Sequence, residues 1–72
     1  MDCEFSTRLR KLREERVPRR SMKTVSELCG LPPDAVRRYE RGDAKPTMDA
    51  LIKLADYYEV SLDYLTGRVP YR

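Results

Sequence analysis

Residues 21–42 of the chain, SMKTVSELCGLPPDAVRRYERG, decide its fold. Ser21 is a good N-cap for a short helix, because a serine oxygen can accept a hydrogen bond from an N–H group of the first turn. Gly30 ends this helix and supplies the left-handed geometry of a tight turn. The apolar stripe between them consists of Val25, Leu28 and Cys29. The stretch therefore predicts a short amphipathic helix followed by a sharp turn.

A second helix follows this turn and ends at Gly42. Pro33 is expected at the first helical position, where its missing N–H costs no hydrogen bond. Asp34 would then lie in the first turn, where a negative charge meets the helix dipole favourably. The spacing places Val36 and Tyr39 on one side, and it leaves off that side Arg37, Arg38 and Arg41. Two helices joined by so tight a turn form a helix-turn-helix unit.

Helices are also predicted on both sides of this unit. Phe5, Leu9 and Leu12 recur with helical spacing after a possible cap at Asp2, and Pro18 ends this helix near Arg16. Thr47 caps a fourth helix with a wide apolar face, made of Met48, Leu51, Ile52, Leu54, Ala55 and Tyr58. A fifth helix has Ser61 as its cap, Leu62 and Leu65 as buried residues, and Gly67 as its stop. No segment alternates as a strand would, so the fold class is all-α with five helices.

Length and charge narrow the function. The 72 residues suit one small domain spanning 1–72, and no apolar run approaches the roughly 20 residues of a membrane span. The first residues are charged where a signal peptide would be apolar, which predicts a cytoplasmic protein. The net charge is +3, and eleven of the 15 Lys and Arg side chains precede Gly42. This asymmetry favours one face that binds a polyanion, although a solvated basic surface would give the same composition.

Catalysis and metal binding are not expected. The chain has no histidine, no Gly-rich phosphate loop and no paired-acid constellation, so we predict that it is not an enzyme. Cys3 and Cys29 are far apart and are expected to be free structural thiols. We therefore predict no metal, no cofactor and no small-molecule ligand.

The motifs together resemble a known family, the Cro and phage-repressor class of helix-turn-helix regulators, also called the xenobiotic-response-element type. The resemblance covers Phe5 to Gly67. It is carried by RLRKLREER in the first helix, by the motif at 21–42 with its ending ERG, and by KPTMDALIKLADYYEVSLDYLTG at the end. Each of these short motifs alone is a weak indication of the family, but their order and spacing together are specific.

This resemblance implies a lambda-repressor-like bundle that binds double-stranded DNA as a homodimer on a near-palindromic operator, and a repressor function. The third helix, Pro33 to Tyr39 and about 33–40 in all, would enter the major groove. The implied base-contacting residues are Pro33, Asp34, Arg37 and Arg38. A structural ion pair is implied between Arg13 and Glu40. The chain departs from the family at Met22, where glutamine is usual and helps to hold a phosphate.

The chemistry of the motif supports particular contacts. Arg38 is the principal candidate for direct readout, since arginine donates two parallel hydrogen bonds to guanine, although it could instead pair with Asp34. Arg37 is better placed for a phosphate. Asp34 could accept from cytosine N4 or could only stabilise the helix start, and Pro33 could touch a thymine methyl. The expected phosphate-contacting positions are Arg19, Arg20, Met22, Lys23 and Lys45, with a solvated basic loop as the alternative.

Two further hypotheses concern protein partners. Tyr57 and Tyr64 are candidates for a dimer surface, because tyrosine is enriched at interfaces, although single half-exposed aromatic residues are ordinary. The second reading of the whole chain is a protein-binding module on the same scaffold, antitoxin-like or a regulatory partner. It is motivated by Met22, Pro33 and Asp34, which stand where DNA readers prefer polar or basic groups.

Overall fold

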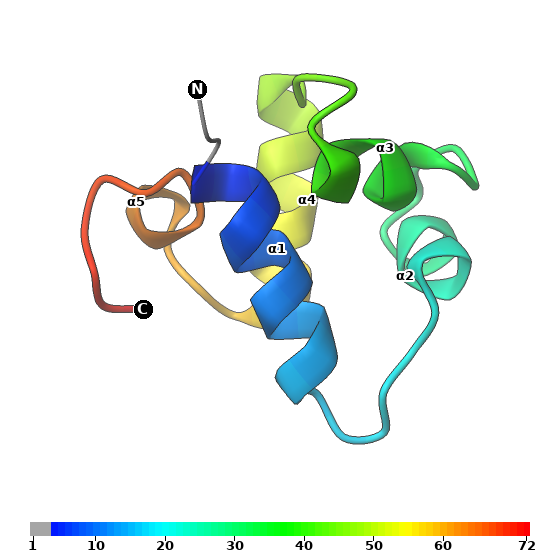
Figure 1. Ribbon diagram of the computed structural model, residues 1–72, viewed down its shortest axis with the longest axis horizontal. Coiled ribbons are helices and arrows are strands. Elements are labelled where there is room, and N and C mark those ends of the chain that lie inside the picture. Colours follow the sequence, from blue (N-terminus) through cyan, green and yellow to red (C-terminus); the bar gives the residue numbers. More distant parts are fainter. Residues whose placement is uncertain (1–3) are drawn as a thin grey trace.

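The computed structural model describes residues 4–72, which form five α-helices and no β-strand within that range. The helices are α1 (Glu4–Glu15), α2 (Met22–Leu28), α3 (Ala35–Arg41), α4 (Met48–Tyr58) and α5 (Leu62–Leu65). Figure 1 shows α2 and α3 together at one end of the bundle, α5 at the other, and α1 and α4 between them. The all-α prediction is confirmed, whereas the expected roles of Asp2 and Cys3 lie outside the described residues.

Three helices begin as the sequence predicts. Ser21, Thr47 and Ser61 all have extended backbone geometry, and the side-chain oxygen of each accepts a hydrogen bond from the backbone N–H three residues later. The donor–acceptor distances are 3.0–3.1 Å. Each bond satisfies one of the N–H groups that a helix leaves without a partner in its first turn.

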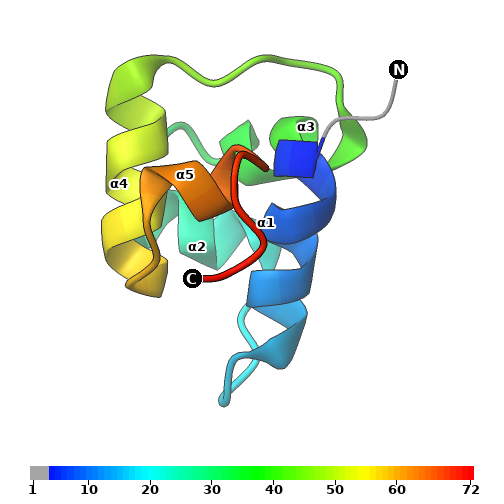
Figure 2. The same ribbon diagram turned by 90° about the vertical axis from the view of Figure 1, so that its left-hand side faces the viewer.

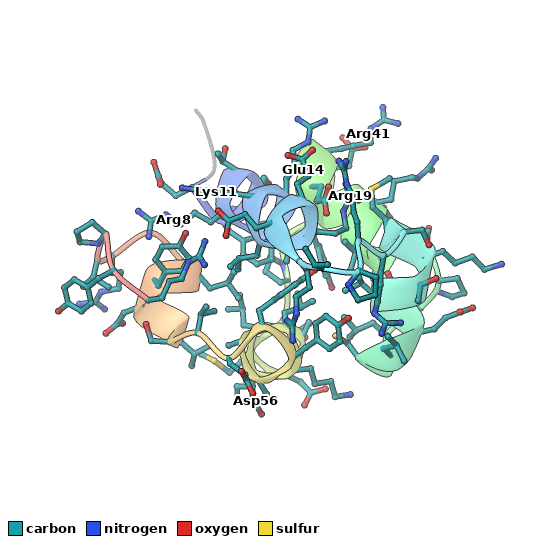
Figure 3. All side chains as sticks on the ribbon, turned by 90° about the horizontal axis from the view of Figure 1, so that it is seen from below. Arg8, Lys11, Glu14, Arg19, Arg41 and Asp56 are labelled. Carbon is teal, nitrogen blue, oxygen red and sulfur yellow. The ribbon has the colours of Figure 1, made fainter. Side chains whose placement is uncertain are left out.

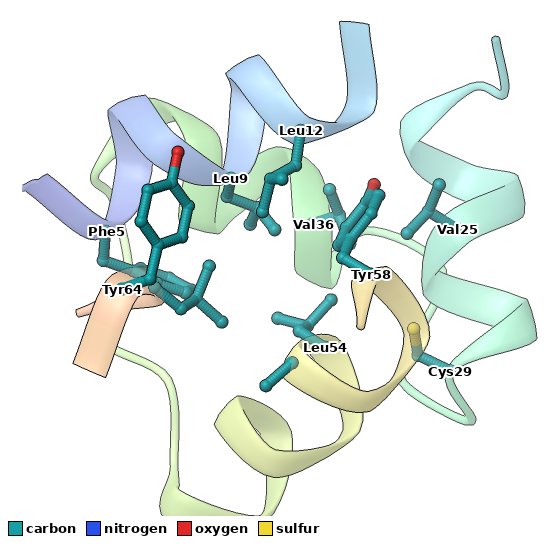
Figure 4. Packing of buried hydrophobic residues seen from close by; sticks show 11 residues of the cluster. Phe5, Leu9, Leu12, Val25, Cys29, Val36, Leu54, Tyr58 and Tyr64 are labelled. Atoms are coloured by element: carbon teal, nitrogen blue, oxygen red, sulfur yellow. The ribbon is translucent and has the colours of Figure 1, made fainter. Parts of the chain in front are cut away.

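The core lies between α1 and α4, and α2, α3 and α5 enclose it (Figures 2 and 4). Leu9, Leu54 and Leu65 are fully buried, each with 0% of its surface exposed. Phe5 extends the cluster toward α3, since its ring meets that of Tyr39 edge-on with 5.8 Å between the centroids. One continuous cluster therefore sets the relative positions of all five helices.

The predicted apolar faces of three helices are too wide. Four residues expected in the core are exposed instead: Leu28 at 55%, Met48 at 65%, Ile52 at 43% and Leu62 at 37%. A short helix buries only the stripe that meets its neighbours, and on α2 part of that stripe is taken by Ser26, which is 0% exposed. Apolar spacing alone therefore overestimated the buried face.

The start of α3 also differs from the prediction. The helix begins at Ala35 and not at Pro33, because Pro33 and Asp34 form the corner of a turn. The Ala35 N–H donates to the Pro32 carbonyl at 3.0 Å, and Asp34 has φ −100° and ψ 7°. These values suit the third residue of a type I turn, in which proline is favoured at the second position. The helix extends to Arg41, beyond the Tyr39 that the resemblance implies, and Gly42 ends it as the sequence predicts.

The C-terminal segment returns over α1. Nη1 of Arg8 donates to the carbonyl oxygens of Tyr64 and Val69, and its guanidinium lies 4.4 Å from the centre of the Tyr64 ring. Arg72 pairs with Glu15 near the other end of α1. These contacts fasten α5 and the segment after it to the first helix. No helix within residues 4–72 combines the length and the apolar content needed to cross a bilayer.

Candidate nucleic-acid interface

Helix α3 is held at both ends by serine hydroxyls from other helices. At its start, the backbone N–H of Val36 donates to Oγ of Ser26 on α2 at 3.0 Å. At its end, Oγ of Ser6 on α1 donates to the Tyr39 carbonyl at 2.5 Å. Gly42 then ends the helix in left-handed geometry, with φ 78°. The helix is thus fixed to the core by its backbone as well as by its side chains.

A buried ion pair holds the flank of α3. Nε and Nη2 of Arg13 donate to the two carboxylate oxygens of Glu40 at 2.7 and 3.1 Å. The exposed fractions of the two side chains are only 13% and 4%. The hydrogen bonds to Glu40 raise the pKa of Arg13 above its ordinary value. This two-bond geometry is the arrangement that arginine and carboxylate prefer.

The outward side of α3 is entirely basic. Ala35 and Val36 are buried and Tyr39 is half-buried, as an inward face requires. The exposed residues of the helix are Arg37, Arg38 and Arg41. Arg41 pairs with Asp43 at 3.3 Å, and no ion pair joins Arg38 to Asp34. Within residues 4–72, Arg37 and Arg38 have no carboxylate partner, so both guanidinium groups can bind an external anion.

Other basic side chains near the motif share this property. Arg20 and Lys23 flank the start of α2, Lys45 lies in the loop after α3, and none of the three forms an ion pair within the described part of the chain. Arg19 instead pairs with Glu14 at 3.3 Å. In Figure 3, Arg19 and Arg41 lie on the side opposite Asp56, an acid of α4. Most of the Lys and Arg side chains without an ion pair within residues 4–72 therefore lie in or beside the helix-turn-helix unit, and the exceptions are Lys11 on α1 and Arg16 just after it.

A shallow hollow of about 210 Å³ lies beside the first turn of α3. Its walls come from that turn and from the loop before α4, and its lining residues are Pro32, Asp34, Ala35, Arg38, Tyr39, Ala44 and Lys45. Arg38 and Lys45 thus border one recess from different segments. The recess brings a candidate base-contacting residue and a candidate phosphate-contacting residue to one place on the surface.

Three predicted site residues lie in settings that limit their roles. Met22 is half-buried, and its side chain packs against the core. Pro33 and Asp34 are exposed, but they belong to the turn before α3. The carboxylate of Asp34 caps no N–H group of α3, although the residue stands at the N-cap position. Helix-start stabilisation by a capping hydrogen bond is therefore not its role.

The two candidate interface tyrosines differ in burial. Tyr64 is only 5% exposed and packs under Arg8, so its expected place on an association surface is wrong. Tyr57 is half-buried, and the guanidinium of Arg16 lies 5.0 Å from its ring centre. Arg16 also donates to the Tyr57 carbonyl at the end of α4. Tyr64 was misplaced because α5 is one turn long and the returning chain covers it.

Sequence reasoning missed Ser26. Its hydroxyl is fully buried, accepts from Val36 on α3 and donates to the Met22 carbonyl at 2.9 Å. The available signal was a small polar residue directly after Val25, on the face of α2 that must meet α3. Cys29, on the same helix side, is a buried free thiol, and burial raises its pKa. Within residues 4–72, no three potential metal ligands of the His, Cys, Asp or Glu type lie together.

Comparison with known proteins identifies relatives of the chain. A family model described as Helix-turn-helix matches residues 9–65. The cryptic phage CTXphi transcriptional repressor RstR of Vibrio cholerae is 39% identical over 44 residues, which are 61% of this chain and 39% of the repressor. The HTH-type transcriptional regulator YobD of Bacillus subtilis is 35% identical over 63 residues, 88% of this chain and 54% of YobD.

A solved structure is similar over nearly the whole chain. The crystal structure of a transcriptional regulator from Listeria innocua superposes with a TM-score of 0.80 and 30% sequence identity. The match covers 96% of this chain and 63% of the regulator. The chain therefore spans about two fifths to two thirds of the length of these three relatives.

Proposed function

Because this chain belongs to the helix-turn-helix family of the Cro/C1 type, we propose that it is a DNA-binding transcriptional regulator and, more specifically, a repressor. The family assignment also bears out the prediction that it is not an enzyme. The observation that carries the proposal is the set of exposed cations without carboxylate partners around α2 and α3. Such a set would attract the phosphate backbone of DNA.

In this proposal α3 enters the major groove, and Arg37 and Arg38 on its outward side face the bases. Arg38 borders the hollow beside the first turn, where its guanidinium can approach a guanine edge and donate two hydrogen bonds. Arg37 is one residue further round the helix and contacts either a base or a phosphate. Pro33 and Asp34 lead into the helix, so their contacts are confined to bases at the leading end.

The phosphate contacts come from both sides of α3. Arg20, just before α2, and Lys23, in its first turn, approach one strand of the duplex, and Lys45 approaches the other from the loop before α4. Arg19 can join them only by giving up or sharing its ion pair with Glu14. Such contacts fix the register of the protein on DNA without reading sequence. Met22 contributes through its position at the start of α2 and not through its side chain.

Assembly and location complete the proposal. The protein acts in the cytoplasm as a homodimer, with one α3 in each half of a near-palindromic operator. The two half-sites are about one helical turn apart, as in other dimeric helix-turn-helix proteins. Tyr57 remains a candidate for the dimer surface, because the residue is only half-buried.

Binding to a labelled duplex of random sequence, measured by fluorescence anisotropy at several salt concentrations, tests this function. The logarithm of the association constant should fall by about 0.9 per neutralised phosphate for each unit of log salt concentration. Selection from a random pool should then yield a preferred sequence with two related half-sites. Absence of binding even at low salt would overturn the proposal and favour a protein-binding module.

A further inference from the structure

The start of α3 lacks the local cap that three other helices have. Ser21, Thr47 and Ser61 each cap the helix that they precede, whereas the side chain of Asp34 makes no such bond. The proline turn is the reason, because it gives Asp34 φ −100° and ψ 7° in place of the extended geometry of a capping residue. The first turn of α3 must therefore find an acceptor elsewhere.

Ser26 supplies that acceptor from α2. Its Oγ accepts from the Val36 N–H at 3.0 Å, in the first turn of α3, and donates to the Met22 carbonyl at 2.9 Å. Both Ser26 and Val36 are 0% exposed, so water cannot replace the bond. The Ser26 carbonyl also accepts from the Leu31 N–H at 2.8 Å. One residue thus holds both the turn after α2 and the start of α3.

This contact bears on the DNA surface, because Arg37 and Arg38 directly follow Val36. Fixing the Val36 N–H to α2 sets how far α3 is rotated about its own axis and how deeply it sits. Both arginine side chains move with any such rotation. Hydrogen bonds to base edges need side chains held within roughly 0.5 Å and 10–20° of their working geometry. A small rotation of α3 would therefore weaken base contacts before it weakened contacts to phosphate.

We infer that Ser26 is a positioning residue for DNA recognition, because its hydroxyl caps α3 from α2 and thereby aims Arg37 and Arg38. This inference rests on the proposed function and deepens it. Ser26 itself touches no DNA, since it is fully buried. Its removal should therefore reduce the preference for the operator over other sequences, while leaving the general affinity for DNA in place.

The test compares Ser26→Ala and Ser26→Cys with the wild-type protein. The alanine variant removes the acceptor. The cysteine variant keeps nearly the same side-chain volume but replaces the hydroxyl oxygen with a weakly accepting sulfur. Ser61→Ala is the matched control, because it also removes a serine cap of a helix, α5, at the end of the bundle away from α3. Affinity is measured for the best duplex selected by the wild-type protein and for a random-sequence duplex, with circular dichroism to verify folding.

In both Ser26 variants, the ratio of the affinity for the selected duplex to the affinity for the random duplex should fall about tenfold. This fall is comparable with the loss of one base contact. Their random-duplex affinity and salt slope should stay within about twofold of wild type, since these depend on phosphate contacts. Ser61→Ala should keep the wild-type ratio. If Ser26→Ala does not fold, the nearly isosteric Ser26→Cys decides the matter.

Two results would overturn the inference while leaving the proposed function intact. The first is that the folded Ser26 variants keep the affinity ratio of the wild-type protein. The second is that Ser61→Ala lowers this ratio as much as the Ser26 variants do. Wild-type protein that shows no salt-dependent binding to any duplex would instead remove the proposed function, and this inference with it.

Discussion

Arg13 on α1 and Glu40 on α3 meet through two parallel hydrogen bonds, of 2.7 and 3.1 Å, that are almost closed off from water. The pair joins the first helix to the end of the helix that carries the candidate base contacts. Its burial makes its energetics asymmetric. Removing one partner leaves the other charge buried and unpaired, whereas an apolar pair of similar volume avoids that penalty.

The first prediction concerns this pair. Glu40→Ala should lower the free energy of unfolding by about 3–5 kcal/mol, because Arg13 keeps its charge in a nearly dry site. The double variant Arg13→Met, Glu40→Leu should regain most of that loss. Urea denaturation followed by circular dichroism measures both.

Glu15→Ala is the control for the Arg13–Glu40 experiment. It breaks the ion pair of Glu15 with Arg72, whose side chains are 41% and 45% exposed, and it should cost less than about 1 kcal/mol. If Glu40→Ala were as mild as this control, the buried pair would have no special role in stability.

A second prediction compares two glycines with positive φ. Gly30 and Gly67 have φ 72° and 88°, so alanine is strained at both, by about 1–2 kcal/mol. At Gly30 a new Cβ would meet only the flexible end of Lys53, at 3.9 Å. At Gly67 it would collide with Cβ and Cγ of Glu4.

Gly67→Ala should therefore lower the melting temperature more than Gly30→Ala does, with an added cost of about 1–3 kcal/mol for the overlap. Differential scanning calorimetry of the two variants makes the comparison. Equal losses would mean that the α1–α5 contact at Glu4 yields easily.

Much of this fold could be predicted from residues that act locally. Ser21, Thr47 and Ser61 cap their helices as expected, since a cap depends on neighbours three residues away. The basic outward side of α3 also follows from spacing, as the burial of Val36 and the exposure of Arg37 and Arg38 show. The features that could be predicted are thus those that depend on the sequence of a single helix or a single turn.

The features that could not be predicted depend on how helices meet. Leu28 and Ile52 have the spacing of core residues, yet no neighbouring helix covers them. Tyr64 belongs to the buried core cluster, and the guanidinium of Arg8 lies over its ring. Ser26 caps a helix ten residues away, a relationship that no local capping rule contains. The turn at Pro33 was predictable in principle, because proline is favoured at the second position of a type I turn. Proline is also favoured at the first position of a helix, however, and the sequence alone does not distinguish the two.

A third prediction concerns the alkaline limit of stability. Burial raises the pKa of Tyr58 above its ordinary value, and no group within residues 4–72 hydrogen-bonds to its hydroxyl. In the unfolded chain the same group loses its proton near pH 10. Below that pH both states hold the proton. Above it only the folded state does, so the stability that Tyr58 contributes falls as pH rises.

Tyr58→Phe removes both the buried hydroxyl without a partner and the group whose pKa is raised. The variant should be as stable as wild type at pH 8 or more so, by up to about 1 kcal/mol, because the hydroxyl is buried without a partner. Its stability should also decline less steeply than that of wild type above about pH 10. Tyr71→Phe, at a residue 71% exposed, should leave the profile unchanged. Urea unfolding at several pH values gives the comparison, and parallel profiles for wild type and Tyr58→Phe would contradict this account.

A fourth prediction addresses direct readout. Arg38→Ala should weaken binding to the selected operator by about 1–3 kcal/mol and relax the preference at one base position of each half-site, because it removes a two-bond contact to guanine. Repeating the selection from a random pool with the variant shows which position relaxes. Arg41→Ala on the same helix is the control, since Arg41 already pairs with Asp43. Unchanged affinity and unchanged preference in Arg38→Ala would assign base readout elsewhere.

The fifth prediction separates phosphate contacts from base contacts. Lys45 lies in the loop beside the hollow at α3, is exposed, and forms no ion pair within the described residues. Lys45→Ala should weaken binding to selected and random duplexes by the same factor and make the salt slope shallower by about 1. Arg68→Ala removes one positive charge near α5, at the other end of the bundle, where Arg68 pairs with Asp63. If a positive net charge alone drove binding, the two variants would show the same change in slope. If Lys45 contacts a phosphate, only Lys45→Ala makes the salt slope shallower.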